Sequence, residues 1–481
     1  MWLLYWVENY HLLVESLGRA QYNTDMPTII ENQQAVVEAL QQLAHRVNTE
    51  VDKALERQMI KPEEEILKRR KVKRFLYTPR GIQRYIFEWE YETSLSWQKA
   101  VRKVQEGVKR SEEFLSVRRM NPARQGKGFP VQLDTFVEHV ITQRLNNSRL
   151  NSPDIELLTK QFLDDISGEE VFYHCRVLLE GLILAVDEIK FRSEEGVYSI
   201  RQTRPEDLDP CLYCETLAKH ERFPTAVLEF EATFSDPALI KDRIDRAIAI
   251  LRLFKAAGVQ CFCCHGEADS ILHKFPMGVV HSQLNYRPVE KGLVTAEDAE
   301  RLKRFWAKVS VEIPAAFYQA VKESPTPSQI AYQRYYTALL QEGSFERRVA
   351  QTVMGLEGIF LRSRGKDEAA FRLSFRAAKV MAAFGFDAYQ ARDILEDAYL
   401  IQRTFGHGEL LAAREKKKIL KKYKGQNFIG ILLNYLRLSI LIMLTAFKEK
   451  EGFLQLIDDA AIDRVKDTQL LNLIQSARKN F

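Results

Sequence analysis

Apolar residues recur at helical spacing through the last third of the chain. From residue 295 to the C-terminus they return every three or four positions, which is the period of an amphipathic helix. Ser344 and Asp387 stand immediately before two of these stretches and are expected to cap the N-termini of helices. Gly406 and Gly408 follow the second stretch and are expected to end its helix. The range 295–481 is therefore predicted to be a helical domain.

The pattern changes between residues 169 and 294, where strands and a helix are expected. Residues 225–234 alternate apolar and polar side chains, which indicates a half-buried strand. Residues 237–257 have helical spacing, and short strand-like segments follow near 259–264 and 277–285. The range 169–294 is predicted to be an α+β middle domain.

The first part of the chain is expected to be mostly helical. Residues 29–67 carry apolar residues at helical spacing, whereas residues 85–92 alternate and are a candidate strand. The stretch 121–130 is rich in Pro and Gly, so a domain boundary is expected there. The predicted segments are a helical N-terminal region (1–125), a linker or helical connection (126–168), the middle domain and the C-terminal helical domain. The predicted fold class is α+β and predominantly helical.

Composition places the chain among globular proteins. It has 481 residues, of which 46% are hydrophobic and 28% are charged, which is enough for a large core. The net charge of +5 is too small to indicate a nucleic-acid partner by itself, so the distribution of basic residues matters more. Six cysteines are too few for a disulfide framework, which favours a reducing, cytoplasmic location.

Two apolar segments are not expected to enter a membrane. The N-terminal Met1–Val7 is interrupted at Glu8 and has no basic region before it, so it does not resemble a signal peptide. Residues 428–447 are nearly all apolar and long enough to span a bilayer, but they contain Asn434 and Arg437. A buried helix of a bundle is the better interpretation of this segment, and no membrane partner is expected.

Arg403 and His407 are the candidate catalytic residues. They are four positions apart, which places them on one face of a continuing helix, and the glycines on both sides of His407 favour an exposed imidazole. Histidine transfers protons near neutral pH, and arginine offers a fork of donors to the charge that builds on a phosphate. Such a pair can cut RNA without a metal, through attack by the RNA's own 2′-hydroxyl. The alternative from spacing alone is a surface ion site or a histidine at a helix C-cap.

The stretch from Ser344 to Phe481 resembles the Apea-like HEPN (higher eukaryotes and prokaryotes nucleotide-binding) family. The segments that carry the resemblance are Glu346–Leu361, Asp397–Gly408, Asn434–Ile440 and Phe453–Ala461. Residues 243–255 also resemble the helix that often precedes such domains in longer members. The resemblance does not extend to the first 160 residues.

The resemblance implies a helical, dimeric domain that places an Arg and a His from each copy around a shared cleft. Arg403 and His407 match the residue types of the family's motif. Many members of the family are metal-independent endoribonucleases in toxin–antitoxin or antiphage defence systems. RNA, a second copy of the chain and an antitoxin or other regulatory partner are therefore the expected partners, and no cofactor is expected for catalysis.

The spacing of the pair departs from the family's pattern. Three residues separate Arg403 from His407, where the family usually has four to six. The number of residues from Tyr399 to His407 does match the family's pattern, but in that alignment the position of the family's arginine is occupied by Gln402. Arg403 is one residue further along, and one residue turns a side chain by about 100° on a helix. A catalytically weak or inactive scaffold, which dimerises and binds RNA or nucleotide, is therefore kept as an alternative.

A basic helix is expected directly after the candidate pair. Residues 414–424 contain seven basic residues in eleven, and Ile419, Leu420 and Tyr423 are expected to face the core. The residues expected to bind RNA phosphates are Lys416, Lys417, Lys418, Lys421, Lys422 and Lys424. The alternative is a solvated helix face without a partner. The separate basic run 68–74 follows three glutamates and is expected to take part in ordinary helical charge pairing.

Four cysteines are candidate ligands of a structural zinc. Cys211 and Cys214 have the two-residue spacing of a zinc half-site, and Cys263 and Cys264 are expected to supply the other half. The alternative is that Cys261 and Cys263 alternate on a strand and are buried as small hydrophobic residues.

Other enzyme classes lack their sequence signatures. The chain has no P-loop, no glycine-rich dinucleotide fingerprint and no Gly-x-Ser-x-Gly elbow. ATPase, dehydrogenase and α/β-hydrolase functions are therefore disfavoured.

Overall fold

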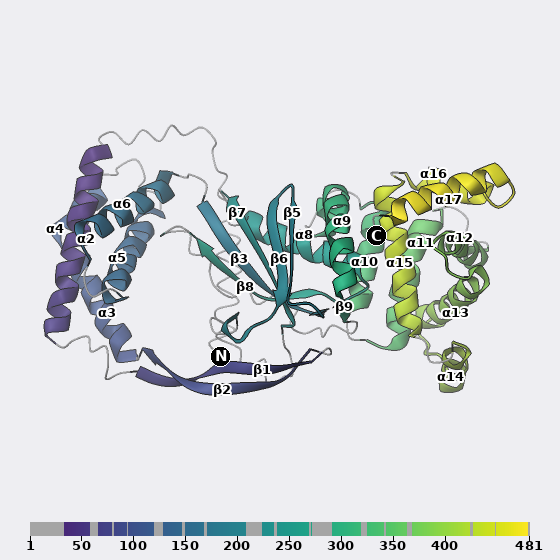
Figure 1. Cartoon of the computed structure of the whole chain (residues 1–481), viewed down its shortest axis with the longest axis horizontal. Coiled ribbons are helices and arrows are strands. Elements are labelled where there is room, and N and C mark those ends of the chain that lie inside the picture. The colour runs from purple at the N-terminus through teal and green to yellow at the C-terminus, as the bar shows by residue number, and fades with distance from the viewer. Residues whose placement is uncertain are drawn as a thin grey trace. The chain divides into compact units, whose positions relative to one another are not determined.

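The computed structural model describes most of the chain as helices and antiparallel strands (Figure 1). The described residues are 33–57, 66–78, 81–93, 95–119, 128–146, 150–167, 171–207, 224–234, 238–268, 271, 291–318, 325–340, 343–362, 368–423, 427–447 and 449–479. The fold class is α+β and predominantly helical, as predicted. The chain forms two compact units, Met1–Pro62 with Leu95–Glu169 and Glu63–Ser94 with Glu170–Phe481.

The first unit is a bundle of helices around α2. Its described helices are α2 (Gln33–Glu56), α3 (Leu95–Val108), α4 (Glu112–Arg119), α5 (Gly128–Asn146) and α6 (Ser152–Ser167). The apolar spacing of α2 buries Leu43, Val47 and Val51 against the other helices. Phe136 of α5 and Phe162 of α6 meet with 4.7 Å between their ring centroids. The segment predicted as a linker or helical connection thus contributes α5 and α6 to this unit.

Residues 66–93 form a long two-stranded hairpin in the second unit. β1 (Ile66–Thr78) pairs antiparallel with β2 (Gly81–Thr93). The strand predicted at 85–92 is confirmed as part of β2. The helical interpretation of the basic run 68–74 is wrong, because the run lies on β1. There, cross-strand hydrogen bonds to the alternating sequence of β2 replace the helical ones.

A five-stranded antiparallel sheet forms the middle of the second unit. Its strand order is β5 (Glu188–Ser193), β6 (Gly196–Gln202), β7 (Ala226–Phe234), β3 (Val171–Glu180) and β8 (Gln260–Ala268). A short parallel pair, β4 (Leu182–Leu184) with β9 (Gly292–Val294), lies beside it. The strands predicted at 225–234 and near 259–264 are confirmed as β7 and β8, and the segment near 277–285 lies outside the described residues.

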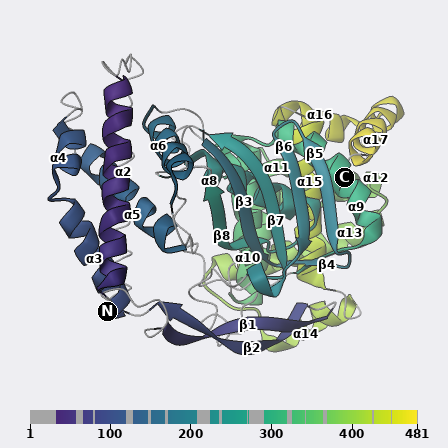
Figure 2. The same ribbon diagram turned by 60° about the vertical axis from the view of Figure 1, so that its left-hand side comes forward.

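The helices of the second unit cover one face of the sheet (Figure 2). α8 (Ala238–Phe254) confirms the helix predicted at 237–257, and α9 (Ala296–Glu312) follows β9. Trp306 of α9 contacts Phe191 and Tyr198 of the sheet, with 4.9 Å between the ring centroids in each case. One hydrophobic core continues from the sheet into the helices beyond. The regions predicted as a middle domain and a helical domain therefore form one compact unit.

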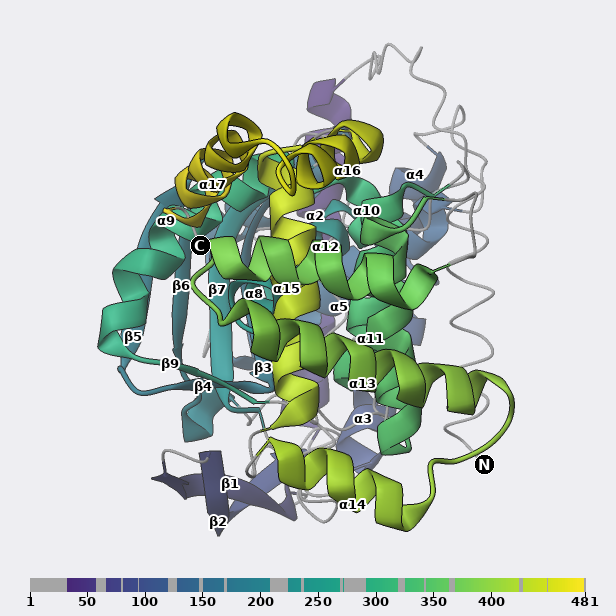
Figure 3. The ribbon, with the colours of Figure 1, turned by 90° about the vertical axis from the view of Figure 1, so that its right-hand side faces the viewer.

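The remaining helices form a bundle next to α9 (Figure 3). They are α10 (Pro327–Leu340), α11 (Phe345–Phe360), α12 (Ala369–Ala383), α13 (Ala388–Gly406), α14 (Ala413–Lys422), α15 (Phe428–Thr445), α16 (Lys450–Asp459) and α17 (Arg464–Arg478). Both predicted N-caps are confirmed. The Ser344 hydroxyl accepts a hydrogen bond from the Arg347 amide at 3.2 Å, and the Asp387 carboxylate accepts one from the Gln390 amide at 2.7 Å.

Helix α15 lies in the centre of this bundle. Its residues Leu432, Leu433 and Leu436 are fully buried, which confirms the predicted bundle helix. Among the described residues, α15 is the one helix long and apolar enough to cross a membrane, and 67% of it is buried inside the chain. Arg437, in its middle, donates hydrogen bonds to the Leu253 carbonyl at 2.8 Å and to the Phe254 carbonyl at 3.0 Å. The guanidinium thus supplies hydrogen-bond donors to carbonyl groups at the C-terminal end of α8, where helical partners are lacking.

Candidate functional site

The C-terminal end of α13 has a defined backbone geometry. The Gly408 amide donates to the Phe405 carbonyl at 2.9 Å, and the Glu409 amide donates to the Thr404 carbonyl at 3.2 Å. These two bonds, with Gly408 at a φ of +83°, are a Schellman motif. His407 is the C-cap residue of the helix, with a φ of −86°. The predicted end of this helix near Gly406 and Gly408 is confirmed, and the backbone at His407 is held by its neighbours.

Arg403 and His407 are both exposed, four residues apart at the end of α13. The opposite side of the helix is buried through Ile394, Ala398 and Ile401. Helical spacing therefore directs Arg403 and His407 towards the same, solvent-facing side. Within the described part of the chain, neither side chain makes a hydrogen bond or an ion pair.

Tyr399 and Gln402 are close to Arg403 on α13. Burial raises the pKa of the Tyr399 hydroxyl, the charge of Glu357 raises it further, and the charge of Arg403 opposes both. Arg403 thus lies within electrostatic range of Tyr399. Gln402, which takes the arginine's place in the alternative register, is half-buried, whereas Arg403 is exposed.

Helix α14 follows the turn after α13 and attaches through one face. Ile419 and Tyr423 are buried and Leu420 is half-buried, as predicted. The Tyr423 hydroxyl donates to Asp397 of α13, and its ring lies 5.2 Å from that of Phe428. Burial raises the pKa of Tyr423, and its hydrogen bond to the Asp397 carboxylate raises it further. The apolar face thus fixes which lysines of α14 remain exposed.

Lys416 belongs to the attached face. Its ammonium group lies 3.0 Å from the Glu346 carboxylate and 4.6 Å from the centre of the Phe345 ring. Burial by itself would raise the pKa of Glu346. Its backbone hydrogen bond and the charge of Lys416 outweigh that effect, so the pKa is lowered. Lys416 is therefore committed to holding α14 against α11.

Lys422 also has carboxylate partners. It lies 3.2 Å from Asp393 and 3.1 Å from Asp397, both on α13. Burial would lower the pKa of Lys422, but its hydrogen bonds to the two carboxylates prevail and raise it. Two of the lysines predicted to bind RNA are thus in ion pairs within the bundle.

The other described basic residues of α14 form an exposed stripe. Arg414, Lys417, Lys418 and Lys421 are all exposed, and their spacing of three, four and seven places them on one side of the helix. None of them has a hydrogen bond or ion pair with a described residue. We call these four residues the cationic stripe of α14. The prediction did not single out Arg414, although its spacing relative to Lys418 and Lys421 gave the signal, and Lys424 lies outside the described residues.

The cysteines of β8 are deeply buried. Cys263 and Cys264 are 1% and 2% exposed, and a strand directs such consecutive residues to opposite faces of the sheet. A register shift beside Phe262 places Cys261 opposite Leu179, on the face of Cys264 and Cys175. Burial raises the pKa of the Cys175 and Cys261 thiols to about 12 and that of Cys264 well above its usual value.

These positions bear on the predicted zinc site. Zinc is bound by thiolates that converge on one point, whereas Cys263 and Cys264 diverge. Among the described residues, no group of three or more His, Cys, Asp or Glu side chains is arranged to hold a metal. Cys211 and Cys214 lie outside the described residues, so the zinc site stays a prediction. The burial of Cys261 and Cys263 agrees with their role as small hydrophobic residues.

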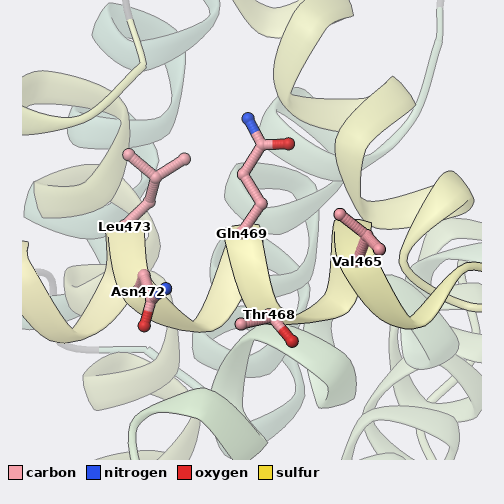
Figure 4. A pocket seen from close by; sticks show the side chains of 5 residues that line it. All are labelled: Val465, Thr468, Gln469, Asn472 and Leu473. Atoms are coloured by element: carbon pink, nitrogen blue, oxygen red, sulfur yellow. The ribbon is translucent and has the colours of Figure 1, made fainter.

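A surface groove lies on α17, apart from α13 and α14 (Figure 4). It has a volume of about 590 Å³ and is lined by Val465, Thr468, Gln469, Asn472 and Leu473. All five residues belong to one helix, and none of them ionises near neutral pH. The groove therefore offers no group for acid–base chemistry.

Comparison of the chain with protein-family models, with curated proteins and with solved structures finds no match. The resemblance to the Apea-like HEPN family accordingly stays a prediction that depends on the quoted segments. The residues themselves define a helix-rich α+β protein in which an exposed Arg/His pair precedes a helix with a cationic stripe.

Proposed function

We propose that this protein binds RNA at the surface formed by the end of α13 and by α14, and that it cleaves the RNA there with Arg403 and His407. The observation that carries the proposal is the exposure of both side chains on one side of α13, followed by the cationic stripe of α14. Cleavage of a phosphodiester is accelerated by a proton-transfer group and a fixed positive charge. A neighbouring stripe of cations attracts the phosphates of the rest of the RNA strand.

The reaction that suits this pair is an internal transesterification of RNA. The 2′-oxygen forms a bond to the adjacent phosphorus, and the bond from phosphorus to the 5′-oxygen breaks. The products are a 2′,3′-cyclic phosphate and a 5′-hydroxyl. His407 exchanges the proton with one of these oxygens, and the Arg403 guanidinium stabilises the charge that develops on the phosphate. We assign the second proton transfer to His407 of a second copy, as the resemblance implies.

The cationic stripe is the part of the surface suited to hold the strand. Its four charges lack intramolecular partners among the described residues, so each is available to a phosphate. Lys416 and Lys422 contribute less, because carboxylates of the same bundle neutralise them. RNA affinity is thus expected to depend mainly on Lys417, Lys418 and Lys421, with Arg414, and to fall with salt.

A second candidate function is RNA binding without cleavage. The observation that favours it is the lack of hydrogen-bonding partners for Arg403 and His407 among the described residues. Catalytic side chains are usually held in place by neighbouring groups, and a free imidazole on a surface turn is not. This alternative shares the binding surface and differs only in the chemistry.

Cleavage of labelled RNA in excess chelator separates the two functions. We expect cleavage by the full chain, a loss of about 10²–10⁴-fold in His407→Ala and a loss of about 10²–10³-fold in Arg403→Ala. Arg403→Lys keeps the charge but not the fork of donors, so it is expected to recover little activity. Gln402→Ala is the matched control and is expected to leave the rate unchanged. Binding without any cleavage would favour the scaffold.

Charge reversal tests the binding surface separately. Lys417→Glu combined with Lys418→Glu is expected to weaken RNA binding strongly and to reduce its dependence on salt. Arg464→Glu with Lys479→Glu, at the exposed first residue and the exposed C-cap residue of α17, is the control of equal charge. Equal effects of the two double variants would refute a specific role for α14.

A further inference from the structure

Glu357 of α11 is a half-buried carboxylate without a described partner. Its side chain forms no hydrogen bond or ion pair with any residue that the structure describes. Burial raises the pKa of Glu357, and no described cation or hydrogen-bond donor counters that effect. The carboxylate has thus lost part of its water without gaining a described partner in return.

The position of Glu357 along α11 is also unfavourable for a negative charge. α11 ends at Phe360, so Glu357 lies in its last turn. The C-terminal turn of a helix carries the negative end of the helix dipole, and an acidic side chain there is destabilising. Burial and the dipole both act against this carboxylate, so stability does not account for a glutamate at this position.

The side of α11 that carries Glu357 faces away from the centre of the bundle. At Gly355 an added Cβ would meet the Leu436 side chain of α15 at 2.7 Å, so Gly355 marks the side that faces α15. Glu357 is two residues further along, which is about 200° around the helix. Glu346 is about three turns earlier on the side of Glu357, and it lies 3.0 Å from Lys416 of α14.

Tyr399 of α13 lies close to this carboxylate. α11 and α13 pack against each other (Figure 3). Besides burial, the charges of Glu357 and Arg403 shift the pKa of Tyr399, in opposite directions. Tyr399 is half-buried and stands one helical turn, about 6 Å, before Arg403. A vacant acceptor and an aromatic ring thus lie beside the arginine that we assign to the phosphate.

We propose that Glu357 and Tyr399 bind an unpaired guanine, the base of the nucleotide whose 2′-hydroxyl attacks. Guanine presents two adjacent donors on its Watson–Crick edge, the N1–H and the N2 amino group, and the two oxygens of a carboxylate accept both. Adenine, cytosine and uracil do not offer two adjacent donors there. The Tyr399 ring provides a surface on which the base stacks. The proposal rests on the proposed function and adds the base that the site prefers.

Cleavage at one chosen nucleotide tests the proposal. The substrate is a fluorescein-labelled DNA strand of thymidines with a single ribonucleotide, because only that nucleotide has the 2′-hydroxyl that the reaction requires. We expect kcat/KM of the full chain to be about 10–100-fold higher with guanosine than with adenosine at that position. Inosine, which lacks the N2 amino group, is expected to fall between the two. Equal values for guanosine and adenosine would overturn the proposal.

Three variants identify the residues that are responsible. Glu357→Gln is expected to lower the guanosine-to-adenosine ratio at least about tenfold, because an amide cannot accept both donors. Glu396→Gln, which removes an exposed carboxylate from α13, is the matched control and is expected to leave the ratio unchanged. Tyr399→Leu is expected to weaken binding of both strands about tenfold, because stacking depends little on the base. A folded Glu357→Gln variant with the wild-type ratio would overturn the role of Glu357.

Thermal unfolding followed by circular dichroism supplies an independent readout. Glu357→Gln is expected to be at least as stable as the wild type, because a neutral amide is free of the burial and dipole effects. A melting temperature lowered by more than about 3 °C would mean that the carboxylate has a stabilising partner within the chain, and it would also overturn the proposal.

Binding to a strand that cannot be cleaved separates this proposal from the proposed function. The probe is an all-DNA strand of thymidines with one guanine or one adenine. A preference for guanine that depends on Glu357, in a chain that cleaves neither ribonucleotide, would overturn only the nuclease. Cleavage of both ribonucleotides without a preference would overturn only the role of Glu357 and Tyr399.

Discussion

The lysines of α14 differ in what they contact, although they are adjacent in the sequence. Lys416 is 3.0 Å from Glu346, which is 70 residues earlier in the chain, whereas Lys417 has no described partner. A charge that is already neutralised by a carboxylate attracts a phosphate less than a free one does. A single position along the helix therefore separates a residue that anchors α14 from one that is free to bind.

The Lys416–Glu346 pair makes stability depend on pH. The pKa of Glu346 is lower in the folded chain than its ordinary value, so the folded state binds fewer protons than the unfolded state. The stability from this group is present at neutral pH and is lost as the pH falls through and below the ordinary pKa of a glutamate, about 4.3. We expect the free energy of unfolding of the wild type to fall towards that of Glu346→Gln over this range, as measured by urea denaturation.

The matched control is Glu415→Gln, which removes an exposed carboxylate from α14. Its free energy of unfolding is expected to stay within about 0.5 kcal/mol of the wild type across the same range. A gap between wild type and Glu346→Gln that does not change with pH would contradict the ion pair's role.

Part of the candidate site was predictable from the sequence. Ile419, Leu420 and Tyr423 identified the attached face of α14, and Lys416 stands four residues before Leu420 on that same face. Periodicity thus contained the signal that Lys416 is not free. The pairing of Lys422 with Asp393 and Asp397 was not predictable, because it depends on how α14 folds back along α13.

At the scale of secondary-structure elements, the end of α13 depends on one glycine. Gly408 has a φ of +83°, which an L side chain adopts only with strain, and an added Cβ would meet no atom within 4 Å. Gly406 also has open space around it but lies within the right-handed helix. The two glycines therefore differ in backbone conformation alone.

Alanine at each glycine is expected to change stability in opposite directions. Gly408→Ala is expected to lower the free energy of unfolding by about 1 kcal/mol through backbone strain. Gly406→Ala is expected to raise it by up to about 1 kcal/mol, because alanine favours the helix. Urea denaturation measures both. Changes of the same sign would mean that the Schellman turn is not what ends the helix.

Elements set by local interactions were predictable from the sequence, and elements set by distant partners were not. Ser344 and Asp387 marked helix starts because side-chain oxygens there satisfy free amides, which is a local effect. The basic run 68–74 was misassigned because its pairing partner is in another segment, β2. Only the alternation of residues 85–92 indicated that strand, and nothing within the run itself indicated β1.

At the scale of the whole molecule, Arg437 connects two regions that the sequence presents as separate domains. It joins α15 to the carbonyl end of α8 and also donates to the Asn434 side chain at 2.9 and 3.0 Å. Burial lowers the pKa of Arg437 to about 10, so it remains charged at neutral pH. The boundary predicted at residue 294 could not anticipate this contact.

Removal of the guanidinium is expected to weaken the whole second unit. Arg437→Ala leaves the Leu253 and Phe254 carbonyls without this donor, which costs about 3 kcal/mol. Thermal unfolding followed by circular dichroism is the measurement, and Arg464→Ala, at an exposed position of α17, is the control. A loss below about 1 kcal/mol would indicate that other groups hold α8 and α15 together.

The Arg437 contact also matters while the chain is being synthesised. Phe254 precedes Arg437 by 183 residues. A ribosome that adds ~5–20 residues per second needs roughly 10–40 s to make that stretch. For most of that interval the strands of the sheet and α8 have been synthesised, but α15, which binds the end of α8 through Arg437, has not. Apolar surface on a nascent chain attracts chaperones and invites aggregation. The yield of folded protein is therefore expected to depend on how well the first half is shielded until α15 has left the ribosome.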